Sequence, residues 1–257
     1  MFNMTLTRHD WDELLTAKDA DVRLEALRQN GVLQEVFPVF QTIMDFGGSN
    51  SGHKDLWAHT KQVVIQTVPQ AMYRWVALFH DIGKPQCYSQ FSGKISFHHH
   101  EDASARIFRR AARYSGLFQS SEVEDITFAI KHLGHVEAYE PNWTDAAVRR
   151  LAKELGTHID AVFAVARADC TTARPEKRQH QLKRVHEIRT RIEDVLCQDA
   201  IPPALPKGLG EALMERLGLQ PGPELGHIMK ALKARVETGE LPRNAAIEVY
   251  MDCLPPS

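Results

Sequence analysis

The sequence has few cysteines, almost no net charge and no long apolar run. Its four cysteines lie far apart among 257 residues and form no Cys-x-x-Cys pair, which argues against a disulfide framework or a thiolate zinc site. The 31 Lys and Arg residues against 33 Asp and Glu exclude a globally basic nucleic-acid coat, although a local basic patch stays open. No apolar stretch approaches the ~20 residues that cross a bilayer, so we expect no membrane association.

The amino-terminal segment also lacks the features of a secretory signal. Acidic residues stand in MFNMTLTRHDWDELL where such a signal needs an apolar stretch. Together with the dispersed cysteines, this predicts a cytoplasmic protein with reduced thiols. What the sequence has in quantity is histidine, with 13 residues, so the positions of these imidazoles are the most informative feature.

Strand signals are scarce, and nearly every segment of useful length repeats its apolar residues with a period near 3.6. This periodicity predicts an all-α protein, with at most a short hairpin around Ser92-Gly93. We expect helices over residues 7–17, 21–30, 56–67, 70–80, 100–113, 121–133, 145–155, 159–169 and 176–196, and two or three more over 208–249. The Pro-rich stretch 201–207 is the candidate boundary, so we expect a helical segment over 1–50, a main helical domain over 51–200 and a small helical appendage over 201–257.

Imidazole and carboxylate side chains stand at or near the ends of several predicted helices. The adjacent pair His80-Asp81 follows the apolar run AMYRWVALF, and similar donors stand on four other helices. The full set is His59, His80, Asp81, His100, His132 and Asp169. If the helices pack as a bundle, these donors can converge on one point. Nitrogen and oxygen donors without thiolate suit Mn, Fe, Co, Ni, Zn or Mg, and the set does not choose among them.

The order of these residues resembles the HD superfamily of metal-dependent phosphohydrolases. The sequence is most similar to the HD-containing region of bacterial tRNA nucleotidyltransferases, the CCA-adding enzymes. The similarity is carried by DLWAHT (55–60), RWVALFHDIGKP (74–85), GKISFHHHEDASA (93–105), WTDAAVRRLAKELG (143–156) and ARADC (166–170). It extends over nearly the whole chain and implies an HD-type helical bundle for the main domain, followed by the helical appendage.

The resemblance implies a metal site. Four residues match the family's metal ligands, namely His59, His80, Asp81 and Asp169. His100 and His132 match positions that hold a second ion in some members, so one or two divalent ions are implied. His98 and His99 compete with His100 for its position, and His135 competes with His132; both choices stay open.

The resemblance further implies a hydrolase in which a metal-bound water attacks phosphorus. Asp81 would hold the ion and orient the water, while His100 or His132 would bind the second ion or protonate the leaving oxygen. Lys84 follows His80 by four residues and would neutralise phosphate charge over the metal, which makes it both a catalytic and a substrate-binding candidate.

Arg149 and Arg150 are further candidates for substrate binding, because a guanidinium group matches two phosphate oxygens. Adjacent residues of a helix point about 100° apart, so we expect at most one of them to face the site. The implied substrates are nucleotides or small phosphoesters, either phosphomonoesters or 2′,3′-cyclic phosphodiesters. The sequence leaves the oligomeric state open.

The sequence departs from the family because the nucleotidyltransferase head has no counterpart. Such a head needs a Gly-Ser turn followed by an Asp-x-Asp on a strand, where carboxylates hold two Mg ions. Here Gly48-Ser49 and Asp19-Ala20-Asp21 stand in the reverse order within a helix-rich stretch. We therefore expect no CCA addition.

Three alternatives stay open beside the hydrolase. They are a non-catalytic RNA-binding module, a nucleotidyltransferase-associated module that acts with a separate head subunit, and a di-iron HD oxygenase that uses all six donors. The segment 174–191 holds seven Lys and Arg residues against two Glu, which leaves contact with RNA open. RNA is nevertheless not favoured as a partner, because charge runs on long helices are usually solvated faces.

Overall fold

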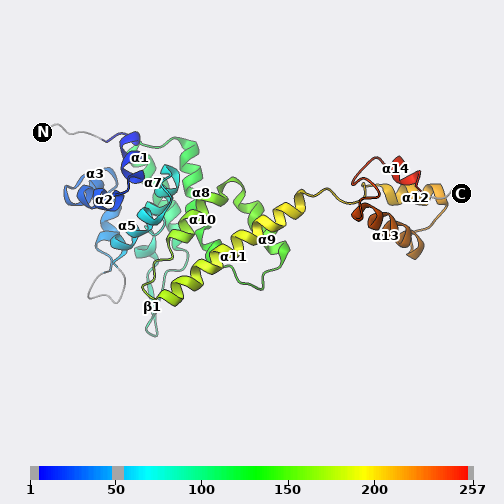
Figure 1. Ribbon diagram of the computed structural model, residues 1–257. Helices are drawn as coiled ribbons and strands as arrows, with labels where there is room; N and C mark the ends of the chain where they lie inside the picture. The colour runs from blue at the N-terminus through cyan, green and yellow to red at the C-terminus, as the bar shows by residue number, and fades with distance from the viewer. Residues whose placement is uncertain (1–5, 48–54, 254–257) are drawn as a thin grey trace. The chain divides into compact units, whose positions relative to one another are not determined.

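The computed structural model of the protein describes residues 6–47 and 55–253, and it confirms the predicted all-α class (Figure 1). The chain divides into two compact units, Met1–Val195 and Leu196–Ser257. None of the described helices combines the length and apolarity that a membrane span requires. The motif at Gly48-Ser49 lies outside the described residues, while Asp19-Ala20-Asp21 begins a helix, as its helix-rich context predicted.

Most described elements belong to the first unit. They are α1 (Arg8–Thr16), α2 (Ala20–Gln29), α3 (Val32–Val36), α4 (Phe40–Met44), α5 (Leu56–Gln66), α6 (Ala71–Phe79), the 3-10 helix η1 (Lys84–Cys87), β1 (Ser89–Phe91), β2 (Lys94–Ser96), α7 (His100–Ser115), α8 (Ser120–Glu137), α9 (Asp145–Leu155), the 3-10 helix η2 (Gly156–His158), α10 (Ile159–Ala168) and α11 (Pro175–Ala200). The last of these helices continues past residue 195 into the second unit.

Helix α6 lies at the centre of the first unit. Its sequence AMYRWVALF is apolar except for Arg74, which donates to the Ala17 carbonyl, and every residue from Arg74 to Phe79 is buried. A helix with so much apolar surface requires neighbours on most faces, and α6 packs against α1, α5, α8 and α10. Edge-to-face aromatic contacts join Trp75 and Phe79 to Phe37, so the N-terminal helices share this core.

The turn after α6 packs directly against α7. Gly83 donates its backbone N–H to Ser104 Oγ at 2.9 Å. A Cβ at Gly83 would lie 2.6 Å from both His100 O and Ser104 N, which are backbone atoms that cannot move independently. Only glycine therefore permits this close approach, which brings the start of α7 beside the end of α6.

The single hairpin of the described chain confirms the one expected from the sequence. Strands β1 and β2 pair antiparallel, with Gln90 opposite Ile95. The turn residues Ser92 and Gly93 both have positive φ, at 49° and 75°, as a two-residue hairpin turn requires.

The second unit is a small helical group with its own core. It contains α12 (Leu209–Leu217), α13 (Pro223–Glu237) and α14 (Ile247–Met251), in agreement with the predicted two or three helices. Leu209, Leu213, Leu232 and Tyr250 are its most buried side chains. Because these residues bury their surface among themselves, this unit does not draw on the core around α6.

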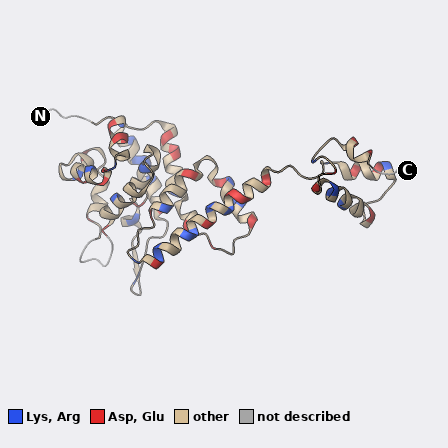
Figure 2. Ribbon diagram, in the orientation of Figure 1, with Lys and Arg blue, Asp and Glu red and all other residues tan. Residues whose placement is uncertain are grey.

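Helix α11 carries the basic segment singled out from the sequence. Figure 2 shows Lys and Arg along this helix with Asp and Glu between them. Three of its arginines form ion pairs with acidic residues of the same unit: Arg184 with Glu140, Arg189 with Asp160 and Arg191 with Asp145. These three positive charges of α11 are therefore paired with acidic residues of the first unit.

Candidate metal centre

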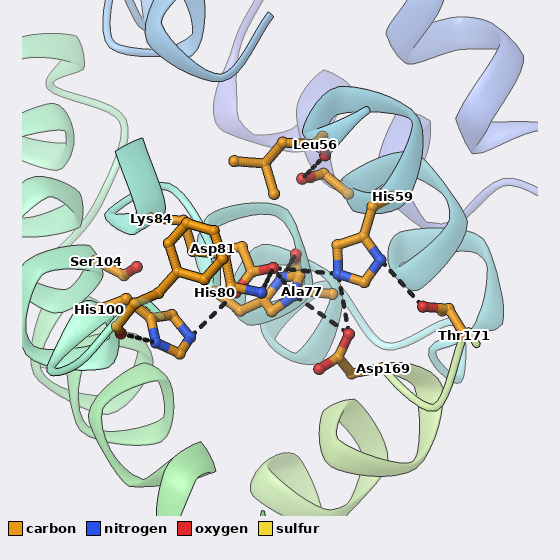
Figure 3. Close-up of polar contacts among 12 residues, drawn as sticks. Leu56, His59, Ala77, His80, Asp81, Lys84, His100, Ser104, Asp169 and Thr171 are labelled. Atoms are coloured by element: carbon orange, nitrogen blue, oxygen red, sulfur yellow. Dashed lines mark hydrogen bonds and ion pairs between the residues drawn. The ribbon is translucent and has the colours of Figure 1, made fainter. Parts of the chain in front are cut away.

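The donor residues meet at one place (Figure 3). They come from the first turns of α5 and α7 and from the C-terminal ends of α6 and α10. The carboxylate of Asp81 lies at the centre of the group. Its Oδ2 lies 3.1 Å from His59 Nε2 and 3.3 Å from His80 Nε2, and its Oδ1 lies 3.3 Å from His100 Nε2. Asp169 Oδ1 lies 3.0 Å from His59 Nε2 and 3.7 Å from His80 Nε2. Five of the six predicted donors are thus brought together.

Local helix structure explains why these side chains point inward. Asp55 caps α5 by accepting a hydrogen bond from the Ala58 N–H at 2.9 Å, which sets the start of the helix that carries His59. His80 is the C-cap of α6, so the apolar helix ends where the adjacent donors His80 and Asp81 begin. Asp169 is likewise the C-cap of the buried helix α10.

The three imidazoles present the same ring nitrogen to the carboxylates. His80 Nδ1 donates to Ala77 O at 2.7 Å, and His100 Nδ1 donates to Phe97 O at 2.9 Å. A carbonyl oxygen only accepts, so Nδ1 carries the proton and Nε2 is the ligand atom. His59 Nδ1 lies 3.1 Å from Thr171 Oγ1, which orients its Nε2 in the same way.

Burial of these donors without hydrogen bonds indicates a bound cation. Asp81 is 1% exposed, and His59 Nε2, His80 Nε2 and Asp81 Oδ1 are buried atoms that make no hydrogen bond within the described residues. Buried polar atoms of this kind are costly unless they are satisfied. A divalent ion would satisfy them at once, and nitrogen and oxygen donors are the set that such ions accept. The residues therefore fit a metal ion.

The electrostatics of the group favour the ionised carboxylates. Burial opposes ionisation of Asp81, but His80 and Lys84 outweigh it and hold the pKa of Asp81 well below its usual value. The close contacts with the His59 and His80 imidazoles likewise outweigh burial at Asp169 and lower its pKa. Burial disfavours the imidazolium of His80, yet the two carboxylates raise its pKa to about 10. A cation that binds here would replace an Nε2 proton, so binding releases protons and strengthens as the pH rises.

Comparisons with known proteins agree with this geometry. The family model described as HD domain matches residues 57–174, the stretch that contains all five clustered donors. Residues 57–174 form an HD domain. HD domains bind divalent metal ions, which is consistent with the donor set described above.

Two relatives extend the similarity beyond the HD domain. The chain is 30% identical to the CC-adding tRNA nucleotidyltransferase of Thermus thermophilus over 226 residues, which cover 85% of this chain and 49% of the relative. It is 25% identical to the A-adding tRNA nucleotidyltransferase of Deinococcus radiodurans over 244 residues, which cover 91% of this chain and 54% of the relative. The chain thus spans about half the length of these relatives.

Two cavities of the first unit border the donor cluster. The larger, of about 330 Å³, is lined by His59 and Asp169 together with Lys84, Lys177 and Phe97. The smaller, of about 60 Å³, adjoins the other side of the cluster. The larger cavity therefore has imidazole and carboxylate groups, lysines and aromatic rings in its wall.

Lys84, a candidate from the sequence, lies next to the donor cluster. Its Nζ lies 2.5 Å from Asp81 Oδ2 and 5.7 Å from the centre of the Phe97 ring. Burial disfavours the ammonium group, but Asp81 and Asp169 raise the pKa of Lys84 above its ordinary value. A permanent positive charge thus stands at the edge of the larger cavity.

Sequence reasoning missed Glu137, which lines the smaller cavity with Asp81 and His100. Burial raises the pKa of Glu137 to about 7, and the carboxylates of Asp169 and Asp81 add to this effect. The helix was expected to end at residue 133, which left Glu137 beyond it, whereas α8 continues to Glu137. A signal was present, because residues 126, 130, 133 and 137 form one helical stripe and the first three are buried and apolar.

The structure does not bring His132 to this cluster, contrary to the expectation for that residue. On α8 it is Leu133 and Glu137 that line the smaller cavity. The His132 ring instead stacks on Phe128, with ring centres 3.9 Å apart, and its Nε2 lies 3.3 Å from Glu154. The rotation of α8 about its axis decides this outcome, since residues 132 and 133 point about 100° apart.

The remaining candidates lie outside the two cavities. Arg149 and Arg150 on α9 line neither of them, so their predicted role in binding phosphate has no support from this geometry. His98 and His99 are exposed, and His99 has a left-handed backbone with φ of 60° just before α7. Among the three consecutive histidines, His100 is the one whose Nε2 faces Asp81.

Proposed function

We propose that the protein is a metal-dependent phosphohydrolase that acts on nucleotides or small phosphoesters. The observation that carries this proposal is a set of three buried ligand atoms that make no hydrogen bond within the described residues, namely His59 Nε2, His80 Nε2 and Asp81 Oδ1. They lie next to a cavity that is also lined by Lys84 and Lys177. Two cations beside a metal centre suit a phosphate group, whose charge they can share with the ion. Phosphomonoesters and 2′,3′-cyclic phosphodiesters are both substrates of this kind.

The chain's own residues would divide the catalytic work. Donors from α5, α6 and α10 would hold the ion, which could be Mg, Mn, Fe, Co, Ni or Zn and which would lower the pKa of a bound water toward neutrality. Asp81 would hold the ion through one oxygen and orient the water through the other. Lys84 and Lys177 would neutralise the phosphate from two sides of the cavity. His100 would serve a second ion or donate a proton to the leaving oxygen.

The wall of the larger cavity supports a nucleotide as substrate. Phe46 and Phe97 both line it and contact each other with ring centres 6.1 Å apart. Aromatic rings offer a stacking surface for a base, and Lys84 and Lys177 line the same cavity. One cavity can thus accept the base and the phosphate of the same molecule.

RNA is the second candidate, and it gains support that the charge pattern alone did not provide. Both relatives are named as tRNA nucleotidyltransferases, and their similarity covers 85% and 91% of this chain. A terminal phosphate of an RNA is a phosphoester of the proposed class. We therefore include RNA ends among the proposed substrates, and RNA binding without hydrolysis is the competing outcome.

The decisive experiment combines metal analysis with turnover. Protein stripped with a chelator is reloaded with each ion separately and assayed on p-nitrophenyl phosphate, bis-p-nitrophenyl phosphate and 2′,3′-cyclic AMP. We expect Asp81→Ala to lower turnover at least about 100-fold and to reduce the bound metal, because it removes the central ligand. Circular dichroism should show that the helical content is retained.

His99→Ala is the matched control, because His99 is exposed and lies one residue from His100. It should retain both metal and turnover. Unchanged turnover in Asp81→Ala would refute the phosphohydrolase. RNA binding with no hydrolysis under any ion would favour the binding module, and bound iron with oxygen consumption would favour the oxygenase.

A further inference from the structure

A second group of metal-binding side chains lies outside the donor cluster of the HD domain. His132 and His135 stand three residues apart on α8, and Glu154 stands on α9. One ligand atom from each of the three residues lies within 4.8 Å of the others. Residues three apart share a helix face, so α8 presents both imidazoles toward the same carboxylate.

The two distances from Glu154 to the imidazoles are close to those between neighbouring ligands of zinc. Glu154 Oε1 lies 3.3 Å from His132 Nε2 and 3.5 Å from His135 Nδ1. Zinc binds nitrogen and oxygen at about 2.0–2.1 Å in tetrahedral geometry, which places two ligands about 3.4 Å apart. Both observed separations therefore equal an edge of such a tetrahedron, and a small movement of the side chains would admit the ion.

His132 is held in the orientation and protonation state that a metal ligand needs. Its Nδ1 donates to Phe128 O at 2.7 Å, which directs Nε2, the atom left for a metal ion, toward Glu154. Its ring stacks on Phe128 and its side chain is only 10% exposed. The His80 and His100 rings are held by the same kind of contact to a backbone carbonyl.

The other two ligands keep the site open to solvent. The side chains of His135 and Glu154 are 46% and 45% exposed, so an ion and a water molecule can reach them. A buried, oriented imidazole beside two accessible ligands gives three protein donors, and water can supply the fourth. Such an ion would join the last turns of α8 to α9.

We propose that His132, His135 and Glu154 form a Zn²⁺ site separate from the metal centre of the HD domain. An ion at this site would link the last turns of α8 to α9. This proposal does not depend on the phosphohydrolase activity, because its ligands take no part in the donor cluster.

Zinc titration by calorimetry tests this site in the full chain after a chelator has removed bound metal. We expect the wild-type protein to bind one more equivalent of Zn²⁺ than either His135→Ala or Glu154→Gln. His180→Ala, an exposed histidine of α11, is the control and should keep the full stoichiometry. Asp169→Ala should lose the other equivalent, from the donor cluster, and keep this one.

A crystal grown with Zn²⁺ gives an independent measurement, since anomalous scattering at the zinc edge locates the ion directly. A peak between His132, His135 and Glu154 supports the proposal. Unchanged zinc stoichiometry in both His135→Ala and Glu154→Gln overturns it, as does an equal loss in the His180→Ala control. Because both substituted side chains are half exposed, neither variant removes core packing.

Discussion

At the scale of single residues, Asp81 is the side chain that contacts most of the other groups of the candidate metal centre. Its two oxygens face His59, His80 and His100 within 3.3 Å, while Lys84 approaches from the fourth side. A carboxylate with so many positive or ligating neighbours stays ionised even when it is almost completely buried. Glu137 of α8 has no such partners within the described residues, and burial together with the charges of Asp169 and Asp81 raises its pKa.

Glu137 provides a pH-dependent test of this crowding. Its pKa is raised from 4.5 to about 7 in the folded protein, so the folded state resists ionisation that the unfolded state undergoes near pH 4.5. In metal-free protein, this residue therefore costs stability as the pH rises from 4.5 to 7, with the full cost above pH 7. We expect Glu137→Gln to stabilise metal-free protein at pH 8 and to have little effect at pH 4.5. Because the Glu137 residue is exposed and solvent screens its charge, the gain should be on the order of 1 kcal/mol or less.

Urea denaturation in the presence of a chelator at the two pH values measures this difference. Glu124→Gln is the control, because Glu124 is a carboxylate of the same helix that lines neither cavity. The interpretation of Glu137 is wrong if Glu137→Gln destabilises the protein at pH 8, or if both variants behave alike.

At the scale of helices and turns, the site depends on how closely the elements approach each other. Gly83 is the clearest case, because a Cβ there would meet backbone atoms of α7 at 2.6 Å. We expect Gly83→Ala to displace α7, which begins with His100, and to destabilise the protein by about 1–3 kcal/mol. The affinity of the donor cluster for a divalent ion should fall as well, because His100 would move away from Asp81.

Gly210→Ala is the matched control for this substitution. A Cβ at Gly210 meets no heavy atom within 4 Å, and its φ is not positive. Thermal unfolding and metal titration of both variants give the comparison. Equal stability and equal metal affinity in the two proteins would show that the approach of α7 to this turn does not position His100.

A salt-bridged contact between α2 and α5 gives a second prediction at this scale. Glu25 accepts hydrogen bonds from Lys61 Nζ at 2.6 Å and Trp57 Nε1 at 2.8 Å, and it also binds Arg28. The Arg28 contact is the largest cause that lowers the pKa of Glu25 to about 2, and Lys61 and Trp57 reinforce it. The resulting stability is present above pH 4.5 and is lost as the pH falls toward 2.

Glu25→Gln should therefore cost about 1 kcal/mol of unfolding free energy at pH 7. Its difference from wild type should shrink between pH 4.5 and pH 2, where the native carboxylate becomes protonated. Denaturation curves across this range measure the effect. Asp19→Asn, which alters an exposed ion pair with Arg23, should be nearly neutral throughout, and a constant cost for Glu25→Gln would contradict the assignment.

Several element boundaries could be predicted from the sequence, and others could not. The helix predicted from residue 145 begins there, and Thr144 caps it, because a cap is a local hydrogen bond that three or four residues determine. The end of α8 was placed a turn too early. Nothing local ends that helix at residue 133, and its last turn is stabilised by the buried stripe that it packs against its neighbours.

At the scale of the whole molecule, we propose that the two compact units unfold separately. The second unit has its own buried residues, including Leu213 and Tyr250, while the metal donors all belong to the first. Leu213→Ala should lower one calorimetric transition by removing about 2–5 kcal/mol of packing. Addition of a chelator should lower only the other transition. A single transition that shifts under both changes would contradict independent units.

The amino-acid sequence by itself determined the helical class, the positions of most helices and the chemical types of the metal donors. These features depend on apolar periodicity and on short motifs such as the His80-Asp81 pair, which are local in the chain. Tertiary structure alone decided that Glu137 and Lys177 face the cavities and that His132 belongs to another cluster. The physical reason is that such choices depend on the rotation and packing of whole helices, which contacts between distant segments determine.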